Sequence, residues 1–207
     1  MRESVSPRTD LSMKKLILII LAMFCVNVAS VNAQEFTKKE LKKIEKDSKE
    51  EAKNSEDRGW QTMPGSPSMQ MQFERAIKAK MERDEYGQGK YIVMPGTSTG
   101  ETYNAAKVLA IQAAKSIIAT NLEQVFEGEI VAHLGDDGVA DASVETAKMR
   151  TRSAVEKKIG QVIVLSEVYK KHGPKSYEVS VQVAYDMQKA MDIAKESARE
   201  ALMDMTK

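Results

Sequence analysis

The sequence predicts an α+β fold, a small antiparallel sheet covered by helices and preceded by a charged N-terminal helix. Residues 106–126 place apolar side chains at steps of three and four, which is the period of one helix face. Residues 177–185 alternate apolar and polar side chains, as a strand with one buried face does. A turn containing glycine and proline, residues 172–176, joins that strand to residues 161–171, which are rich in valine and isoleucine. The two segments are therefore expected to form an antiparallel hairpin with one dry face.

The first segment after the apolar leader, residues 34–58, is mostly charged. Only Leu41, Ile44 and Ala52 lie near one helix face, and so narrow an apolar stripe buries little surface. We expect a solvated charged helix or a tether here, followed by a single α+β domain over residues 59–207.

A helix is predicted to begin at Ser66 and Pro67, an N-cap followed by a first-turn proline. Its apolar face consists of Met69, Phe73, Ala76, Ile77 and Met81. Trp60, the only tryptophan, precedes this helix beside a turn. It could act as a ligand platform, but a tryptophan in this position more often fills the core and hydrogen-bonds through its indole nitrogen, which is the interpretation we favour.

Residues 91–94 are a short predicted strand that Pro95 and Gly96 end. Residues 96–100 then carry two glycines before a helix, as phosphate-binding loops do. The segment lacks the lysine and the spacing of a Walker loop, so a plain turn from strand to helix is expected.

The long helix that follows has alanines in its first half and large aliphatic residues in its second half. Its expected inward residues are Ala106, Ala110, Ala113, Ala114, Ile117, Ile118, Leu122, Val125 and Phe126. A stripe of small residues lets a helix approach its neighbour closely, so this is predicted to be the central packing helix, bent or ended at Gly128. A second helix over residues 141–159 completes a helical hairpin. Its inward residues are Val144, Ala147, Thr151, Ala154, Val155 and Ile159.

The chain ends in an amphipathic helix whose stripe is formed by Met187, Met191, Ala194, Ala198, Leu202 and Met205. Methionine-rich stripes either fill core gaps or form adaptable binding surfaces, and we favour the core. Five helices nevertheless compete for a small sheet. A stripe left over, on this helix or on the helix with Met69 and Phe73, would form an exposed interface unless the helices pack on one another.

The N-terminus, residues 1–33, has the pattern of a secretory signal peptide. Two lysines precede an uncharged apolar run, residues 16–24, and the stretch closes on a small-x-small cleavage site at Ala33. The run is shorter than the roughly 20 residues that span a bilayer, so we expect cleavage after Ala33 and no stable membrane span afterwards. Met13 is the expected translation start, because residues 1–12 do not resemble a basic leader.

Cys25 is the only cysteine, and Phe24 stands where a lipoprotein signal requires a small residue, so lipidation is not expected. Cleavage after Ala33 would leave no cysteine and hence no disulfide. It would also remove four basic and two acidic residues, which leaves 27 basic and 28 acidic side chains. This balance gives little support to nucleic-acid binding or to electrostatic binding of membranes.

The candidate metal ligands gather around His133. It follows Glu129 by one helical turn and precedes Asp136 and Asp137, a set that could bind a divalent cation. No second histidine or cysteine supports the set, and acidic residues beside glycines commonly form turns. We therefore expect turn chemistry here and assign neither a metal nor another cofactor.

Two further residues were considered for catalysis. His172, the other histidine, lies in the hairpin turn and is expected to be exposed. Glu167 is the one carboxylate set between apolar residues, and we expect it on an edge strand or a wet face. No catalytic residue is therefore predicted.

Several short segments carry a resemblance to known proteins. They are Ala33-Gln34, Gly59-Trp60, Met63-Pro64-Gly65, Ala105-Ala106-Lys107, Ala110, Ala114-Lys115, Ile159-Gly160-Gln161-Val162-Ile163, Tyr177-Glu178-Val179 and Val183-Ala184-Tyr185. With them the chain resembles uncharacterised exported proteins of Bacteroides-type bacteria. Residues 103–185 are also similar to the domain of the Helicobacter twenty-kilodalton lipoprotein family and related flagellar outer-membrane assembly proteins. The resemblance covers about half of the chain and implies an α+β envelope domain that often self-associates and has no known catalytic residues. The chain departs from that family by lacking an acceptable lipidation cysteine.

Together these observations predict an exported protein of the periplasm or cell envelope. We expect a non-catalytic scaffold or protein-binding module whose partner is another protein or a second copy of the chain. The alternative is a periplasmic hydrolase that uses carboxylates or a metal near Glu129 and Asp137.

Overall fold

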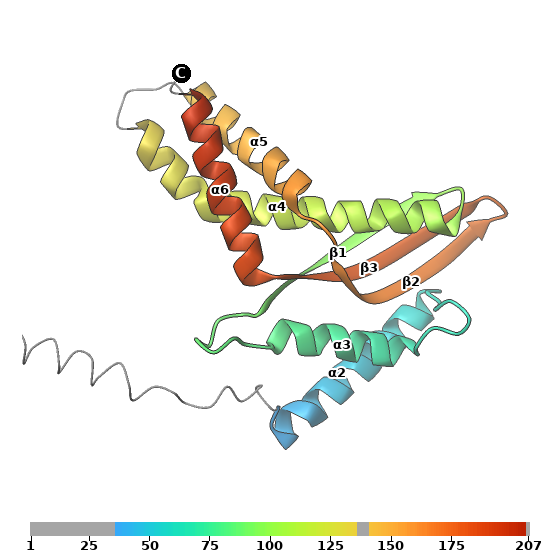
Figure 1. Cartoon of the computed structure of the whole chain (residues 1–207). Helices are drawn as coiled ribbons and strands as arrows, with labels where there is room; N and C mark the ends of the chain where they lie inside the picture. The colour runs from blue at the N-terminus through green and yellow to red at the C-terminus, as the bar shows by residue number, and fades with distance from the viewer. Residues whose placement is uncertain (1–35, 136–140, 206–207) are drawn as a thin grey trace, which may run out of the picture. The chain divides into compact units, whose positions relative to one another are not determined.

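The structure, a computed structural model, describes residues 36–135 and 141–205. The chain divides into two compact units, and every described element belongs to the second, Phe36–Lys207. The described residues form five helices and one three-stranded antiparallel sheet (Figure 1), so the predicted α+β class is confirmed. Among these helices, none is both long enough and apolar enough to cross a membrane.

The strands are β1 (Tyr91–Gly100), β2 (Ile163–Gly173) and β3 (Ser176–Asp186). β3 lies in the centre, and β1 and β2 form the two edges. β2 and β3 make the predicted antiparallel hairpin, with a two-residue turn between Gly173 and Ser176.

The prediction that Pro95 and Gly96 end the first strand is wrong, because β1 continues to Gly100. An edge strand bonds to its neighbour through alternate backbone N–H groups only, so a proline is tolerated at an outward position. A Cβ at Gly96 would overlap the carbonyl oxygen of Ala110 and lie 2.7 Å from the backbone nitrogen of Ala114. Gly96 is therefore where a helix touches the strand, and it does not belong to a strand-to-helix turn.

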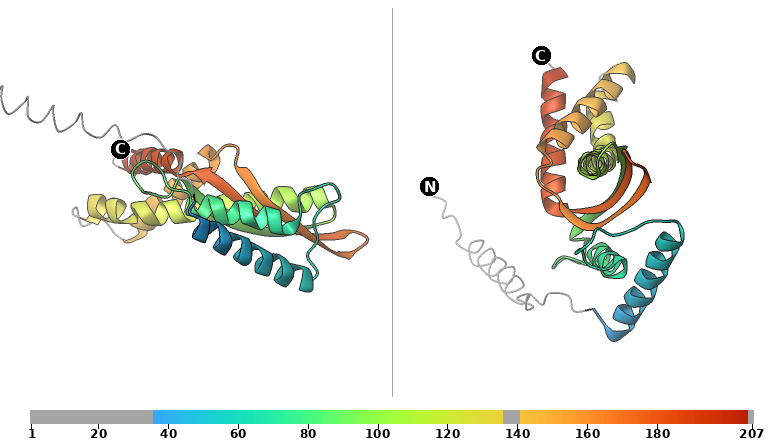
Figure 2. Two further views of the ribbon diagram at one scale, coloured as in Figure 1. Left: turned by 90° about the horizontal axis from the view of Figure 1, so that it is seen from below. Right: turned by 90° about the vertical axis from the view of Figure 1, so that its right-hand side faces the viewer.

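That helix is α4 (Tyr103–Gly135), and the curved sheet wraps around it in the right-hand view of Figure 2. Seven of its buried residues follow one another at steps of four: Ala106, Ala110, Ala114, Ile118, Leu122, Phe126 and Ile130. Because an α-helix has 3.6 residues per turn, each step advances the buried stripe by about 40°. The alanine half contacts β1, as the prediction of a closely packed helix required. Of the two outcomes expected at Gly128, a bend or an end, the end is wrong, since α4 continues beyond it for another two turns.

α5 (Asp141–Lys158) and α6 (Met187–Met205) pack against α4 and against each other. Three residues of α5 that were predicted to face inward are fully buried, namely Ala147, Thr151 and Val155. The prediction is confirmed for them.

The C-terminal stripe up to Leu202 belongs to the core, which confirms the favoured interpretation for these residues, while the side chain of Met205 lies outside the described part of the chain. α6 buries its small residues Ala190, Ala194, Ser197, Ala198 and Ala201. Met187, Met191 and Leu202 are half-buried and pack against the same apolar cluster.

The opposite face of the sheet is covered by α3 (Met69–Met81), and α2 (Lys38–Asp57) packs on α3. The prediction of a single dry face is therefore wrong. Val179, Val181 and Val183 of β3 join the cluster on the α4 side, whereas Ala184 lies in a cluster with Leu165 and two alanines of α3. α3 also starts two residues later than predicted, with Ser68 as its N-cap.

The outer edge of β2 is closed by the segment that leads into α3. Gln61 exchanges two backbone hydrogen bonds of 2.9 Å with Tyr169. The buried side chain of Gln72 accepts a 2.7 Å hydrogen bond from the backbone nitrogen of Glu167. Both edges of the sheet are thus protected from pairing with a further strand. These contacts protect β2, and Pro95 protects β1.

Candidate functional site

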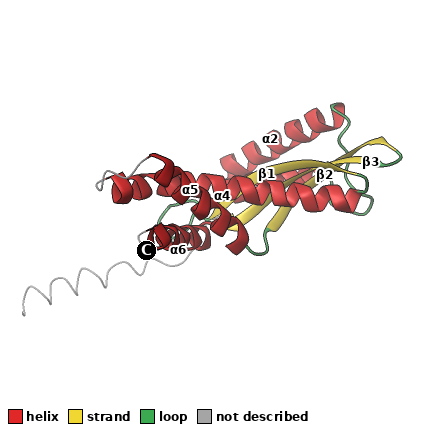
Figure 3. Cartoon of the chain, turned by 90° about the horizontal axis from the view of Figure 1, so that it is seen from above, coloured by secondary structure: helices red, strands yellow, loops and turns green. Residues whose placement is uncertain are grey.

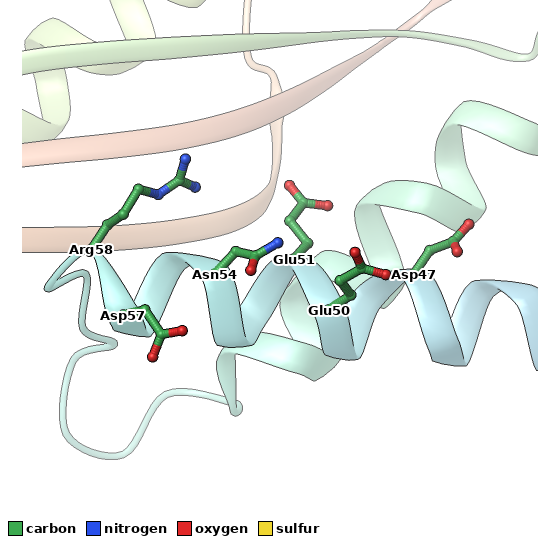
Figure 4. A pocket seen from close by; sticks show the side chains of 6 residues that line it. All are labelled: Asp47, Glu50, Glu51, Asn54, Asp57 and Arg58. Atoms are coloured by element: carbon green, nitrogen blue, oxygen red, sulfur yellow. The ribbon is translucent and has the colours of Figure 1, made fainter.

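The described surface has an acidic hollow that follows α2 (Figure 4). It is lined by Asp47, Glu50, Glu51, Asn54, Asp57 and Arg58. All but Arg58, the C-cap, belong to α2, and Figure 4 shows the side chains projecting from successive turns without meeting at one point. This is the solvated face of a charged helix, and it offers no converging set of ligands.

A second hollow runs along α5 and has a basic character. Its lining consists of Met149, Arg150, Ser153, Ala154, Lys157 and Lys158. Lys158 is already engaged by α6, with its ammonium 2.8 Å from a carboxylate oxygen of Glu200. Like the first hollow, this one follows a single helix.

Glu167 lies on the edge strand β2, as expected, but its side chain does not point to a wet face. Only 19% of the side chain is exposed, and the ammonium of Lys107 in α4 lies 2.7 Å from its carboxylate. Burial raises the pKa of Glu167 above the ordinary value of 4.5. A carboxylate with a raised pKa is a candidate acid or base, yet the partner found here is an ammonium group, as in a structural ion pair.

Three tyrosines pack together on the same side of the sheet, with Tyr103 one helical turn before Lys107 and Tyr169 two residues after Glu167. The ring of Tyr169 makes an edge contact with Tyr103, at 5.6 Å between centroids, and a tilted contact with Tyr177 at 6.5 Å. All three pack against the main apolar cluster.

Trp60 is half-buried and packs on the small cluster formed by Ala52, Met69, Phe73 and Val168, as the core interpretation predicted, whereas the hydrogen bond of its indole nitrogen stays a prediction. The ammonium of Lys170 lies 4.4 Å from the Trp60 ring centroid and covers its outer face.

His172 is exposed, as predicted, and pairs at the hairpin with Glu178 at 2.9 Å.

The proposed metal ligands cannot be assembled from the described residues. Asp136 and Asp137 lie outside them, and the side chains of Glu129 and His133 are likewise not described. In the part of the chain that the structure does describe, no three metal-ligating side chains come together. The metal hypothesis stays a prediction.

The most unusual surface belongs to α4. Every exposed residue of this helix from Tyr103 to Gly128 is uncharged: Asn104, Ala105, Val108, Leu109, Gln112, Ile117, Gln124, Val125 and Gly128. We call these residues, which wind around the helix opposite the winding buried stripe, the outer face of α4. Four of them are large and apolar, with exposed fractions of 65% for Val108, 50% for Leu109, 39% for Ile117 and 58% for Val125. Figure 3 shows the first half of α4 above the sheet with no helix in front of it.

The charged residues of α4 over the same span are only half-exposed and are directed at neighbouring elements. Lys107 binds Glu167 of β2, and the ammonium of Lys115 lies 3.5 Å from the carbonyl oxygen of Ile159. Glu127 lies 2.5 Å from Lys148 of α5. Glu123 lies near Arg152 and Lys148, whose charges oppose the rise in its pKa that burial causes. Charge is therefore used along the sides of the helix and is absent from its outer face.

The sequence patterns did not indicate this face. Periodicity placed Ile117 and Val125 inward and predicted a leftover stripe on α3 or α6. The stripe residues Met69, Phe73, Met187, Met191 and Leu202 of those two helices pack in or against the core clusters. The missed signal was that α4 has more apolar residues than one face can hold.

No protein-family model matches the chain, and neither a curated protein nor a solved structure matches it, so the resemblance to exported envelope proteins stays a prediction.

Proposed function

We propose that this chain is an exported protein of the periplasm or cell envelope that acts as a non-catalytic protein-binding module or scaffold, and that it binds its partner through the outer face of α4. The observation that supports the proposal is the uncharged, partly aliphatic surface of that helix. Protein interfaces are depleted of charge at their centre, and exposed apolar patches on soluble proteins commonly mark them.

The wider composition strengthens this observation. Charged residues make up 29% of the chain, so a helix surface that excludes them differs from the average surface of the same protein. Single exposed aliphatic residues need no explanation. Four exposed aliphatic residues on a helix surface without exposed charge do need an explanation.

Export is supported by the signal-peptide pattern of residues 1–33. N-terminal sequencing of the protein recovered from an exporting bacterium is expected to begin at Gln34. Recovery of the intact leader in the cytoplasm would contradict export.

Binding through α4 can be tested by photo-crosslinking in the cell. A photoreactive amino acid replaces Leu109 in the full chain, and a matched variant carries it at Lys46, an exposed position of α2. Illumination is expected to give a discrete larger adduct at position 109 and none at position 46. The proposal fails if position 109 gives no adduct, or if both positions give the same one.

A further inference from the structure

Three methionines on three different helices are exposed to solvent. Met71 of α3, Met149 of α5 and Met203 of α6 have exposed fractions of 58%, 71% and 64%. Methionine is unbranched and flexible, so at such exposure the side chain presents its thioether sulfur to water. An oxidant dissolved in the surrounding water can therefore reach these sulfur atoms without any opening of the fold.

The other methionines whose side chains are described are less accessible. Met69 is only 4% exposed. Five more are half-buried: Met63, Met81, Met94, Met187 and Met191. Oxidation converts the apolar thioether into a polar sulfoxide, which disrupts packing where the side chain belongs to a core. The same change at an exposed position puts the polar group in water and leaves the packing as it was.

The large apolar residues on the surface are divided by their chemistry. The four on the outer face of α4 are valine, leucine and isoleucine, which contain no sulfur for a peroxide to oxidise. Three of the six that are exposed elsewhere in the described part of the chain are methionine: Leu41, Met71, Tyr86, Met149, Ile163 and Met203. Exposed thioethers are therefore absent from the proposed binding face.

We propose that Met71, Met149 and Met203 are sites of reversible oxidation by peroxides, and that the protein keeps its fold when all three are methionine sulfoxide. In each reaction the sulfur loses two electrons and takes one oxygen atom from hydrogen peroxide, whose other oxygen leaves as water. A methionine sulfoxide reductase supplied with a thiol reverses the step: the thiol is oxidised to a disulfide, and the oxygen leaves as water.

The rate at which each methionine of the protein produced from the full-length chain reacts with hydrogen peroxide tests the proposal. Tandem mass spectrometry of digested samples follows the sulfoxide at each position. Met71 and Met69 are a matched pair, because they lie two residues apart in α3 and differ in burial. Met71 is expected to react roughly tenfold faster or more, since a buried side chain reacts only when the structure opens. In urea that unfolds the chain, the two rates are expected to become equal.

A triple variant with Met71→Leu, Met149→Leu and Met203→Leu gives a second measurement. Leucine has a similar volume and helix propensity but no thioether, so the fold is expected to be retained. The variant is expected to lose the fast phase of oxidation and keep the slow one. For the unmutated protein, the urea midpoint is expected to be the same before and after the three exposed sites are oxidised, and reductase treatment is expected to restore the original mass.

Four results would overturn the proposal. They are equal rates for Met69 and Met71 in the folded protein, a fast phase that persists in the triple variant, a lower urea midpoint after oxidation of the exposed sites, and sulfoxides that the reductase does not remove. The oxidation sites do not rest on the proposed function. If position 109 gives no photo-crosslinked adduct, the proposed function fails, and the peroxide rates still decide whether these three methionines are the sites of oxidation.

Discussion

Helices α2 and α4 lie on opposite sides of the sheet and expose opposite kinds of residues to solvent. Of the 13 exposed residues of α2, 11 are charged, whereas none of the nine exposed residues of α4 up to Gly128 is charged. Both helices have small residues inside: Ser48, Ala52 and Ser55 in α2, and the alanines of the first half of α4. The inner faces of both helices are thus packed with small residues. Only the outer faces differ, since that of α2 is charged and that of α4 is uncharged, as the proposed protein-binding surface requires.

The two sides of the sheet also differ in the interactions that hold the helices against them. The α4 side contains the large apolar cluster and depends on close packing of backbone against backbone at Gly96. The α3 side has two small clusters and a buried glutamine, Gln72, that bonds to the strand edge. Packing therefore dominates one side, and hydrogen bonding contributes a larger share on the other.

The largest effect is expected from Gly96→Ala. The new methyl group overlaps backbone atoms of α4 that no side-chain rotation can move, so we expect a loss of about 3 kcal/mol or more in the free energy of unfolding. Urea unfolding followed by circular dichroism measures it. Gly160→Ala, where a Cβ meets nothing within 4 Å, is the control and is expected to change stability by less than about 1 kcal/mol. Equal effects of the two substitutions would refute the close contact between α4 and β1.

An intermediate effect is expected from Gln72→Leu on the other side of the sheet. It leaves the backbone nitrogen of Glu167 and the carbonyl oxygen of Pro67 without their partner, which is expected to cost about 1–3 kcal/mol. Gln70→Leu, a half-exposed position of the same helix, is the matched control. If both variants unfold at the same urea concentration, hydrogen bonding does not hold this side in the way described.

The smallest effect concerns Glu167, a carboxylate that pairs with Lys107 of α4, and it depends on pH. Because its pKa is raised in the folded state, its contribution to stability is fully present below its ordinary value of 4.5 and is lost as pH rises through the raised value. Glu167→Gln is therefore expected to be more stable, relative to the unmutated protein, at pH 7 than at pH 4. Urea midpoints at the two pH values measure the difference.

Lys107→Gln provides the companion experiment. It removes the ammonium group that lies 2.7 Å from Glu167 and leaves the carboxylate with burial alone, so the pH dependence should become steeper than in the unmutated protein. An unchanged pH dependence in both variants would mean that Glu167 is better solvated than its burial indicates.

Much of the fold could be predicted because local periodicity carries it. The hairpin of β2 and β3, the inward face of α5 and the alanine stripe of α4 follow from patterns within a few residues of each other. β1 could not be predicted in full, because Pro95 and Gly96 are acceptable in a strand only when that strand is at an edge and touches a helix. Both conditions depend on residues far away in the sequence.

The candidate surface was harder to predict than the fold. Ile117 and Val125 have the same chemical character as the buried residues beside them, and only the direction of the winding stripe separates them. Gln72 was also missed, since a polar residue among apolar ones gives no sign that a strand edge lies in front of its side chain.

The four-residue repeat of α4 fixes its phase, that is, which side of each turn faces the core, as well as its length. Deleting one residue between Ala114 and Ile118 would turn everything downstream by about 100° and shift it about 1.5 Å along the helix axis toward the first half of α4. Leu122 and Phe126 would then leave the core, although the composition of the helix would hardly have changed. Residues 64–66, the exposed turn between Gln61 and the start of α3, have no such constraint and can accept added residues at little cost in free energy. Insertions and deletions among descendants of this chain should therefore collect in that segment and avoid α4, except in steps that restore its phase.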